Sequence, residues 1–327
     1  MINRRQALAL AMTSAAPLVS TSTWAQASPW PTKPITLVMP FPAGGQTDGV
    51  ARLLAKHLEP LLGQPVVVDN RPGANSLIGT NLVARSTPDG HTLLLNMTAL
   101  VSNPVLLPNI NYDPHKEFAP VARLYELPAI WAVPGNGPKT LAEFVEKAKA
   151  SKQPLSFATT GHASSSHYFG EMFARSAGLS FNHIPYKGEA PLLPDLSAGR
   201  LDAAIISSAS ALSFGGDGRV RVLAVSGPRR WKALPDLPTF LELGVPGMTT
   251  ESFCGIFAPA RTPKAVVDKL NTAITQVITA PEFQKQLLVQ GLEVAPVITP
   301  EQFSSLMKKA TSEWVDIKKN SDIRVDS

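Results

Sequence analysis

A run of hydroxyl side chains followed by a histidine is the part of the sequence most similar to a catalytic centre. Ser164, Ser165, Ser166 and His167 are consecutive, and a serine activated by a histidine base could cleave esters or amides. However, a nucleophile and its base rarely come from adjacent residues of one helical turn, and the chain has no G-x-S-x-G motif. We therefore expect His167 to pack or to line a binding surface, and a secreted hydrolase is the less favoured alternative.

The remaining histidines do not form a metal-binding pattern. They stand at positions 57, 91, 115, 162 and 183, without H-E-x-x-H or any other paired ligand spacing. His57 falls on the apolar stripe of a predicted helix, which indicates a structural role. We predict no metal site and no cofactor.

A second chemical feature is the stretch "PFPAGGQTD", Pro40 to Asp48, between an apolar run and a helical pattern. Gly44 and Gly45 remove side-chain bulk, so a ligand could approach the backbone, and Thr47 or Asp48 could cap the following helix. The free N–H groups of a first helical turn, together with the helix dipole, favour an anion.

The serine run lies in a similar setting. "SFATTGHASSSHYF", residues 156–169, again reads as a strand, a glycine-containing loop and a helix, with Gly161 in the loop and hydroxyls from Thr159 and Thr160 onwards. One such loop in each of two domains, facing across a cleft, would form a clamp for a small carboxylate. The alternative is that both loops are only well-capped helix starts. Neither has the spacing of a nucleotide site.

The elements around these loops alternate between strands and helices. Strand patterns at 35–41, 65–70 and 91–97 are separated by helical patterns, the first of which has Val50, Leu53, Leu54, His57, Leu58 and Leu61 at helical spacing and ends at Gly63. The alternation recurs from residue 140, where Thr140 and Glu143 have capping-box spacing, and it predicts βαβ units with parallel strands.

Two extended segments bracket the middle layer and suggest a hinged pair of domains. They are 118–134 and 249–260, and a chain that leaves the first domain and returns would cross there twice. Two long helices follow, with Thr262–Pro263 and Thr299–Pro300 expected as N-cap and first helical residue. The sequence therefore predicts an α/β protein of two domains with a cleft between them.

Length and composition agree with a globular chain that is exported. The 327 residues are 44% hydrophobic and 17% charged. Arg4 and Arg5 precede an apolar stretch, and "AQA" at 25–27 predicts signal-peptide cleavage after Ala27 and a periplasmic protein, by the Sec or the twin-arginine route. Loss of these two arginines lowers the net charge from +5 to +3, which is not typical of a nucleic-acid-binding protein. The only cysteine, Cys254, is expected to be a buried apolar residue.

The chain as a whole resembles a known family. "WPTKPITLVMPFPAGGQTDGVARLLAKHLEPLLGQPVVVDNRPGAN" is similar to the start of mature Bug proteins, the extracytoplasmic solute-binding proteins of tripartite tricarboxylate transporters. "PDGHTLLL", "YDPHKEFAPVARL", "HIPYKGEAPLLPDLSAGRLD" and "FAPARTP" continue the resemblance in order, over residues 30–320.

The resemblance implies a type II Venus-flytrap fold of the periplasmic-binding-protein class. It implies a first domain from 28–126 and 249–327, a second domain from 127–248, and a monomer that delivers a small carboxylate to an integral-membrane permease. Presentation of the ligand to a sensor kinase is an alternative that the sequence does not separate from transport. The ligand-binding residues implied by the resemblance are Phe41, Pro42, Ala43, Gly44, Gly45, Gln46, Thr47, Asp48, Met97, Thr98, Thr160, Gly161, Ser164, Ser165, Ser166, His167, Ile206 and Ser207.

Two positions depart from the pattern of many relatives. Gln46 replaces a glycine and is expected to place a neutral amide at the edge of the cleft. Ile206 stands at a usual aspartate position, which predicts a carboxylate ligand without an α-amino group, with an apolar or ring-like distal part. If the family aspartate only contacts its own backbone, Ile206 says nothing about the ligand.

Overall fold

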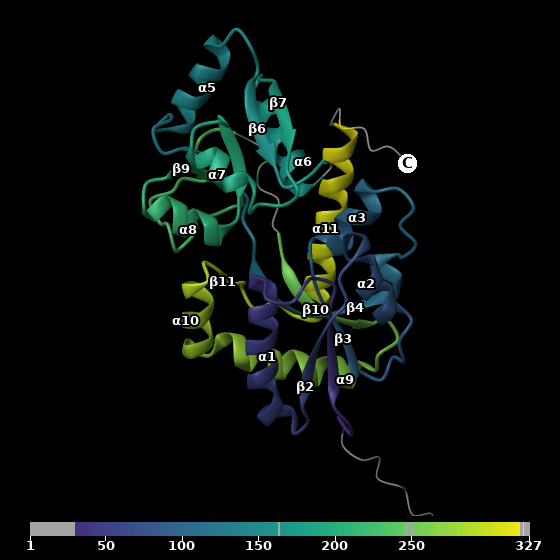
Figure 1. Ribbon diagram of the computed structural model, residues 1–327. Coiled ribbons are helices and arrows are strands. Elements are labelled where there is room, and N and C mark those ends of the chain that lie inside the picture. The colour runs from purple at the N-terminus through teal and green to yellow at the C-terminus, as the bar shows by residue number, and fades with distance from the viewer. Residues whose placement is uncertain (1–29, 163, 246–247, 249–251, 321–322, 324–327) are drawn as a thin grey trace, which may run out of the picture.

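The computed structural model describes residues 30–162, 164–245, 248, 252–320 and 323. These residues form two lobes, each built around one β-sheet, called the lower and upper lobe after their places in Figure 1. The predicted two-domain α/β fold is confirmed. The predicted signal peptide and its cleavage site lie outside the described residues.

The lower lobe has a mixed sheet with the strand order β11-β4-β10-β3-β1-β2. β1 is parallel to β2 and β3, whereas β10 is antiparallel to β3 and β4. Since α1 (Gln46–Leu62) and α2 (Leu77–Ala84) connect the parallel strands, the carboxyl ends of those strands lie at one edge of the sheet. The strands are β1 (Ile35–Met39), β2 (Val66–Asn70), β3 (Thr92–Met97), β4 (Phe118–Glu126), β10 (Cys254–Pro259) and β11 (Glu293–Val294).

Helices cover both faces of this sheet. One hydrophobic cluster joins the sheet to α1, α9 and α10, and a second joins it to α2, α3 and α11. The bounds are α1 (Gln46–Leu62), α2 (Leu77–Ala84), α3 (Ala99–Leu106), α9 (Lys264–Thr279), α10 (Pro281–Val289) and α11 (Pro300–Lys319), with the short helices η1 (Ala74–Ser76) and α4 (Pro114–Glu117).

The upper lobe has the strand order β7-β6-β8-β5-β9, with β6 parallel to β7 and β8. β5 is antiparallel to β8 and β9, so both sheets are mixed and the predicted parallel pairing holds only for their βαβ parts. The elements are β5 (Ile130–Pro134), α5 (Leu141–Ala150), β6 (Leu155–Thr159), α6 (Ser165–Ala177), β7 (Phe181–Pro185), α7 (Leu192–Ser197), β8 (Ala203–Ile206), α8 (Ser208–Gly216) and β9 (Val220–Val225).

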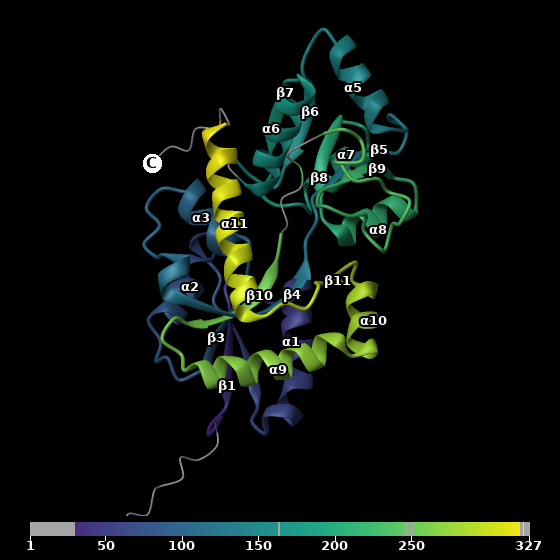
Figure 2. The ribbon, with the colours of Figure 1, turned by 180° about the vertical axis from the view of Figure 1, so that it is seen from behind.

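Two chain passages join the described parts of the lobes, and one helix packs against both of them. β4 continues into β5 through 127–129, the chain returns from β9 to β10, and α11 extends upward beside both lobes (Figure 2). Trp314 and Ile317 of α11 belong to the hydrophobic cluster of the upper lobe, where Trp314 packs edge-on against Tyr168 and Phe169. The C-terminal helix is therefore shared between the lobes.

Most predicted helix ends are confirmed, with two corrections. Thr299 forms a capping box with Gln302, and the hydroxyl of Thr140 accepts from the Glu143 N–H. Thr262 is not an N-cap, because α9 starts at Lys264 and Pro263 takes that place. In α1 the residue that closes the apolar stripe is Leu62, whereas Leu61 is exposed.

Candidate ligand site

The β1–α1 loop is held in shape by the buried carboxylate of Asp48. Its oxygens accept from the Gly44 N–H at 3.0 Å, from Arg52 Nε at 2.9 Å and from Asn70 Nδ2 at 3.0 Å. Asn70 also donates to the carbonyl of Phe41 at 3.1 Å. Asn70 ends β2, beside the end of β1, so the edge of the parallel sheet brings it to the loop.

Ionised Asp48 is the stable form in this network. The hydrogen bond from Arg52, reinforced by those from Gly44 and Asn70, lowers the pKa of Asp48 to about 2 against the opposing effect of burial. The carboxylate is therefore charged at neutral pH, and it fixes the loop from the side of helix α1.

The start of α1 is open. Gly45 is the N-cap residue, without a side-chain cap, and residues 42–45 are exposed. The prediction that Thr47 or Asp48 caps the helix is wrong. The Asp48 carboxylate accepts from the Gly44 N–H, before the helix, and the Thr47 hydroxyl accepts from Tyr125 Oη at 3.4 Å. The uncapped first turn, beside glycines that leave the backbone accessible, can receive an anion.

The β6–α6 loop is a compact hydroxyl network. Ser164 caps α6 and donates to the Gly161 carbonyl at 2.7 Å, and its hydroxyl lies 2.9 Å from that of Ser166. Ser166 Oγ accepts from the Thr160 N–H at 3.1 Å. Ser165 is the exposed member of the serine run. These hydroxyls stabilise the loop and give it donors that can turn toward a ligand.

His167 belongs to a histidine stack. Its ring lies 3.5 Å from that of His183, centroid to centroid, and 5.2 Å from that of His162. Burial, followed by the neighbouring histidines, lowers the pKa of His167 to about 4, and burial with His162 lowers that of His183 to about 4. Both rings are neutral at pH 7, and the His167 ring packs as expected.

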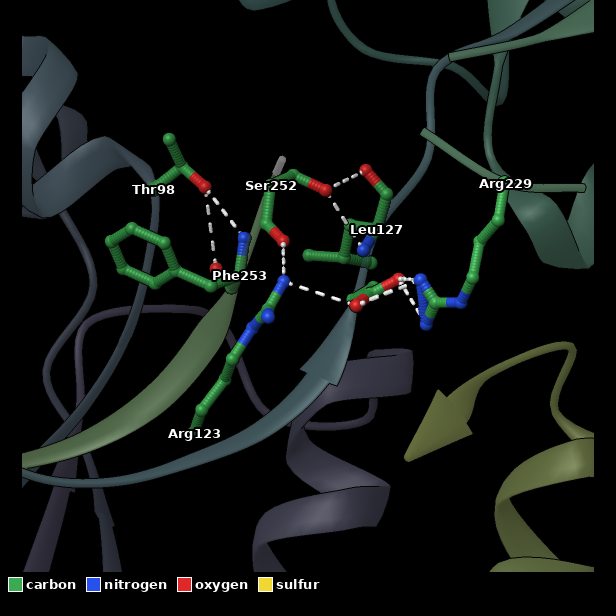
Figure 3. Close-up of polar contacts among 7 residues, drawn as sticks. Thr98, Arg123, Leu127, Arg229, Ser252 and Phe253 are labelled. Atoms are coloured by element: carbon green, nitrogen blue, oxygen red, sulfur yellow. Dashed lines mark hydrogen bonds and ion pairs between the residues drawn. The ribbon is translucent and has the colours of Figure 1, made fainter. Parts of the chain in front are cut away.

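Met97 ends β3 and Thr98 follows it, next to a segment that connects the lobes. Thr98 Oγ1 accepts from the Phe253 N–H at 2.8 Å (Figure 3). The Thr98 N–H donates to the Phe253 carbonyl at 2.9 Å. Met97 is half-buried. These two predicted site residues therefore lie where β10 re-enters the lower lobe.

Ile206 ends β8 in the upper lobe, and Ser207 follows it. Ile206 is 2% exposed and packs in a hydrophobic cluster with residues that include Ile130 and Leu192. Ser207 caps α8, and its N–H donates to Glu189 Oε1 at 2.8 Å. The Ile206 side chain is thus covered by its own lobe in this conformation, and its effect on ligand choice stays a prediction.

The Gln46 side chain has a role that the sequence reading missed. Its amide donates to the Gln290 carbonyl at 2.5 Å, so it joins the start of α1 to the turn between α10 and β11. Gly291, the next residue, lies against Ser208 and Ala209 of α8. The same turn therefore contacts the start of α1 and the start of α8, which follows β8, so these edges of the two lobes face each other. Because β6 is parallel to β8, the β6–α6 loop shares that edge of the upper lobe.

A polar network joins the connecting segments (Figure 3). The buried guanidinium of Arg123 lies 3.1 Å from Glu126 Oε1 and donates to the Ser252 carbonyl at 3.3 Å. Glu126 also pairs with Arg229 of the upper lobe at 2.9 Å, and the Leu127 N–H donates to Ser252 Oγ at 2.9 Å. These contacts hold the outgoing and returning segments together, as a hinge requires.

Two kinds of feature are absent from the residues that the structure describes. Among those residues, no group of three or more His, Cys, Asp or Glu could hold a metal ion. No helix in the same ranges is both long and apolar enough to cross a membrane. Cys254 is buried, as expected, and burial raises the pKa of its thiol to about 12.

Comparisons with known proteins agree with this geometry. The family model described as "Tripartite tricarboxylate transporter family receptor" matches residues 50–322. The periplasmic binding protein BugD is 34% identical, with a TM-score of 0.75 over 90% of this chain and 99% of that one. A Rhodopseudomonas palustris protein solved with adipate is 32% identical, with a TM-score of 0.77 over 89% and 98% of the chains.

A second protein from the same organism, MatC, was solved with bound malate. It is 30% identical, with a TM-score of 0.74 over 88% of this chain and 99% of that one. The predicted resemblance is thus confirmed, and the hydrolase alternative is excluded because this is a family of solute-binding receptors. The chain belongs to the tripartite tricarboxylate transporter receptors, whose fold is that of the periplasmic binding proteins.

Proposed function

We propose that this protein captures one small organic carboxylate between its lobes, without turnover, and delivers it to the integral-membrane permease of a tripartite transporter. The observation that supports this most is the uncapped start of α1, with exposed glycines, opposite the hydroxyl-rich β6–α6 loop. Relatives with bound malate and adipate point to the same ligand class.

We propose that the ligand carboxylate binds the first-turn N–H groups of α1, while the β6–α6 loop with Thr160, Gly161 and Ser165 contacts its distal end. Met97 and Ser207 would border the same space, since Met97 ends β3 and Ser207 follows β8 at the facing edges. The first domain, 28–126 with 249–327, would move relative to the second domain, 127–248, when the ligand binds. Charge-assisted hydrogen bonds of this kind are compatible with micromolar affinity, about −8 kcal/mol.

Calorimetry with malate and adipate tests binding. We expect a stoichiometry near one and chemically unchanged ligand, and a ligand at ~100 times its dissociation constant should stabilise the fold by roughly 2.7 kcal/mol. If a panel of mono-, di- and tricarboxylates leaves the melting temperature unchanged, the proposal is wrong.

Matched ligand pairs test the inference from Ile206. We expect succinate to bind better than aspartate, and benzoate better than a phenyl amino acid, by ~10-fold or more, because an ammonium group would lose water without gaining a partner. Equal or tighter binding of the amino-bearing member in both pairs would show that Ile206 does not select against an amino group.

We further propose export with cleavage after Ala27, so that the mature chain starts at Ser28 and acts as a monomer in the periplasm. The paired arginines, the apolar stretch and the small residues around Ala27 support this. Intact-mass analysis of the exported protein should give the mass of 28–327, and any other N-terminus refutes the assignment.

A further inference from the structure

The turn between α10 and β11 is the place where the lower lobe meets the first turn of α8. A Cβ atom built on Gly291 would lie 3.0 Å from Leu212 Cδ1, 3.1 Å from the Ser208 carbonyl carbon and 3.2 Å from the Ala209 nitrogen. Figures 1 and 2 show α8 next to this turn from both sides. The backbones approach this closely only because residue 291 has no side chain.

The chain conformation at this turn also requires glycine. Gly291 has φ +70° and follows the end of α10, where its N–H donates to the Leu288 carbonyl and the Leu292 N–H donates to the Leu287 carbonyl. Leu287 and Leu292 are buried in the lower-lobe cluster. The turn is therefore anchored in the lower lobe, while its tip contacts the upper lobe.

Gln46 connects this tip to the candidate ligand site. Its Nε2 donates to the Gln290 carbonyl, and Gln290 Oε1 lies beside Gly49 of α1. Gln46 is the first helical residue of α1, adjacent to the uncapped N-cap Gly45. A shift of the α1 start would thus move the turn, and the turn would move against α8.

We propose that Gln290–Gly291 is the contact on which the two lobes close, and that Gln46 couples it to the ligand loop. Gly291 is then a positioning residue: it sets how near α8 comes to α1, and so how well the closed site holds its ligand. The effect on affinity rests on the proposed function, whereas the effect on the distance between the lobes does not.

The test compares Gly291→Leu with Gly63→Leu. Gly63 ends α1 with the same φ of +70°, and a Cβ built there has no heavy atom within 4 Å, so both variants carry the same backbone strain but only the first fills the contact. Gly291→Ala is a milder form in case the leucine variant unfolds. Spin labels on Lys56→Cys in α1 and Lys149→Cys in α5, both exposed positions, report the interlobe distance, since Cys254 is buried.

Without ligand, we expect Gly291→Leu to shift the distance distribution to longer values and Gly63→Leu to leave it unchanged. With malate or adipate as probe, the dissociation constant should rise about 10-fold in Gly291→Leu relative to Gly63→Leu, because a smaller fraction of molecules closes. Gln46→Ala should weaken binding with an unchanged ligand-free distance.

The outcomes separate the two proposals. Identical distance distributions in Gly291→Leu and Gly63→Leu overturn the closing contact, even if malate or adipate binds. If neither ligand binds the unsubstituted protein but the distances differ as expected, the contact stands and the ligand assignment fails.

Discussion

Asp48 offers a quantitative test of the ligand loop. Its side chain is 6% exposed and accepts three hydrogen bonds, one of them from Arg52. These interactions lower its pKa from 3.8 to about 2. Since one pKa unit corresponds to about 1.4 kcal/mol, ionised Asp48 would stabilise the fold by at most about 2–3 kcal/mol, and screening near the surface reduces this to about 1–2 kcal/mol.

The substitution Asp48→Asn removes this charge and keeps the shape. We expect the free energy of unfolding at pH 7 to fall by about 1–2 kcal/mol, because one acceptor becomes a donor that faces another donor. Asp69→Asn is the control, since Asp69 also pairs with a nearby arginine, Arg71, but is more exposed. It should cost less than about 0.5 kcal/mol.

The direction of the pKa shift of Asp48 determines how the stability of the fold changes with pH. The folded-state pKa of Asp48 lies below the unfolded value, so its stabilising effect is complete above pH 4 and is lost as the pH falls toward 2. Urea titrations at several pH values should therefore show the difference between Asp48→Asn and the unsubstituted protein shrinking below pH 4. A difference that is absent at pH 7, or constant across this range, would refute the electrostatic account.

Two further predictions concern the upper lobe. Because the folded-state pKa values of His167 and His183 are about 4, the unfolded chain binds more protons between pH 4 and 6.5, so the free energy of unfolding should fall by several kcal/mol as the pH drops through this window. Denaturant titrations of His183→Gln should show a shallower fall, and an unchanged slope contradicts the assignment. Gly170→Ala should cost about 1–3 kcal/mol, because its Cβ would lie 2.0 Å from the ring of Phe157, whereas Gly215→Ala, in open space in α8, should be neutral or stabilising by up to about 1 kcal/mol. Equal melting temperatures for the two alanine variants would contradict this packing.

The sequence by itself determined the local features. Apolar runs predicted the strands, and threonines before helical patterns predicted the caps at Thr140 and Thr299, because these signals depend on residues within one or two turns of each other. The glycines of the first loop also marked an accessible helix start, since backbone freedom is a property of the residue type. The two crossing segments, 118–134 and 249–260, were visible as extended patterns for the same reason.

Only the tertiary structure decided which distant groups meet. Asn70 reaches Asp48 because β1 and β2 are parallel neighbours, and the edge rule for such sheets could have suggested it. Gln290 lies 244 residues from Gln46, so no local pattern in the sequence indicates the hydrogen bond between them. Trp314 of α11 is buried in the hydrophobic cluster of the upper lobe, although the first turns of the same helix pack on the lower lobe. Such contacts follow from how whole layers pack, and local periodicity fixes only which face of an element is apolar, not the distant element that covers it.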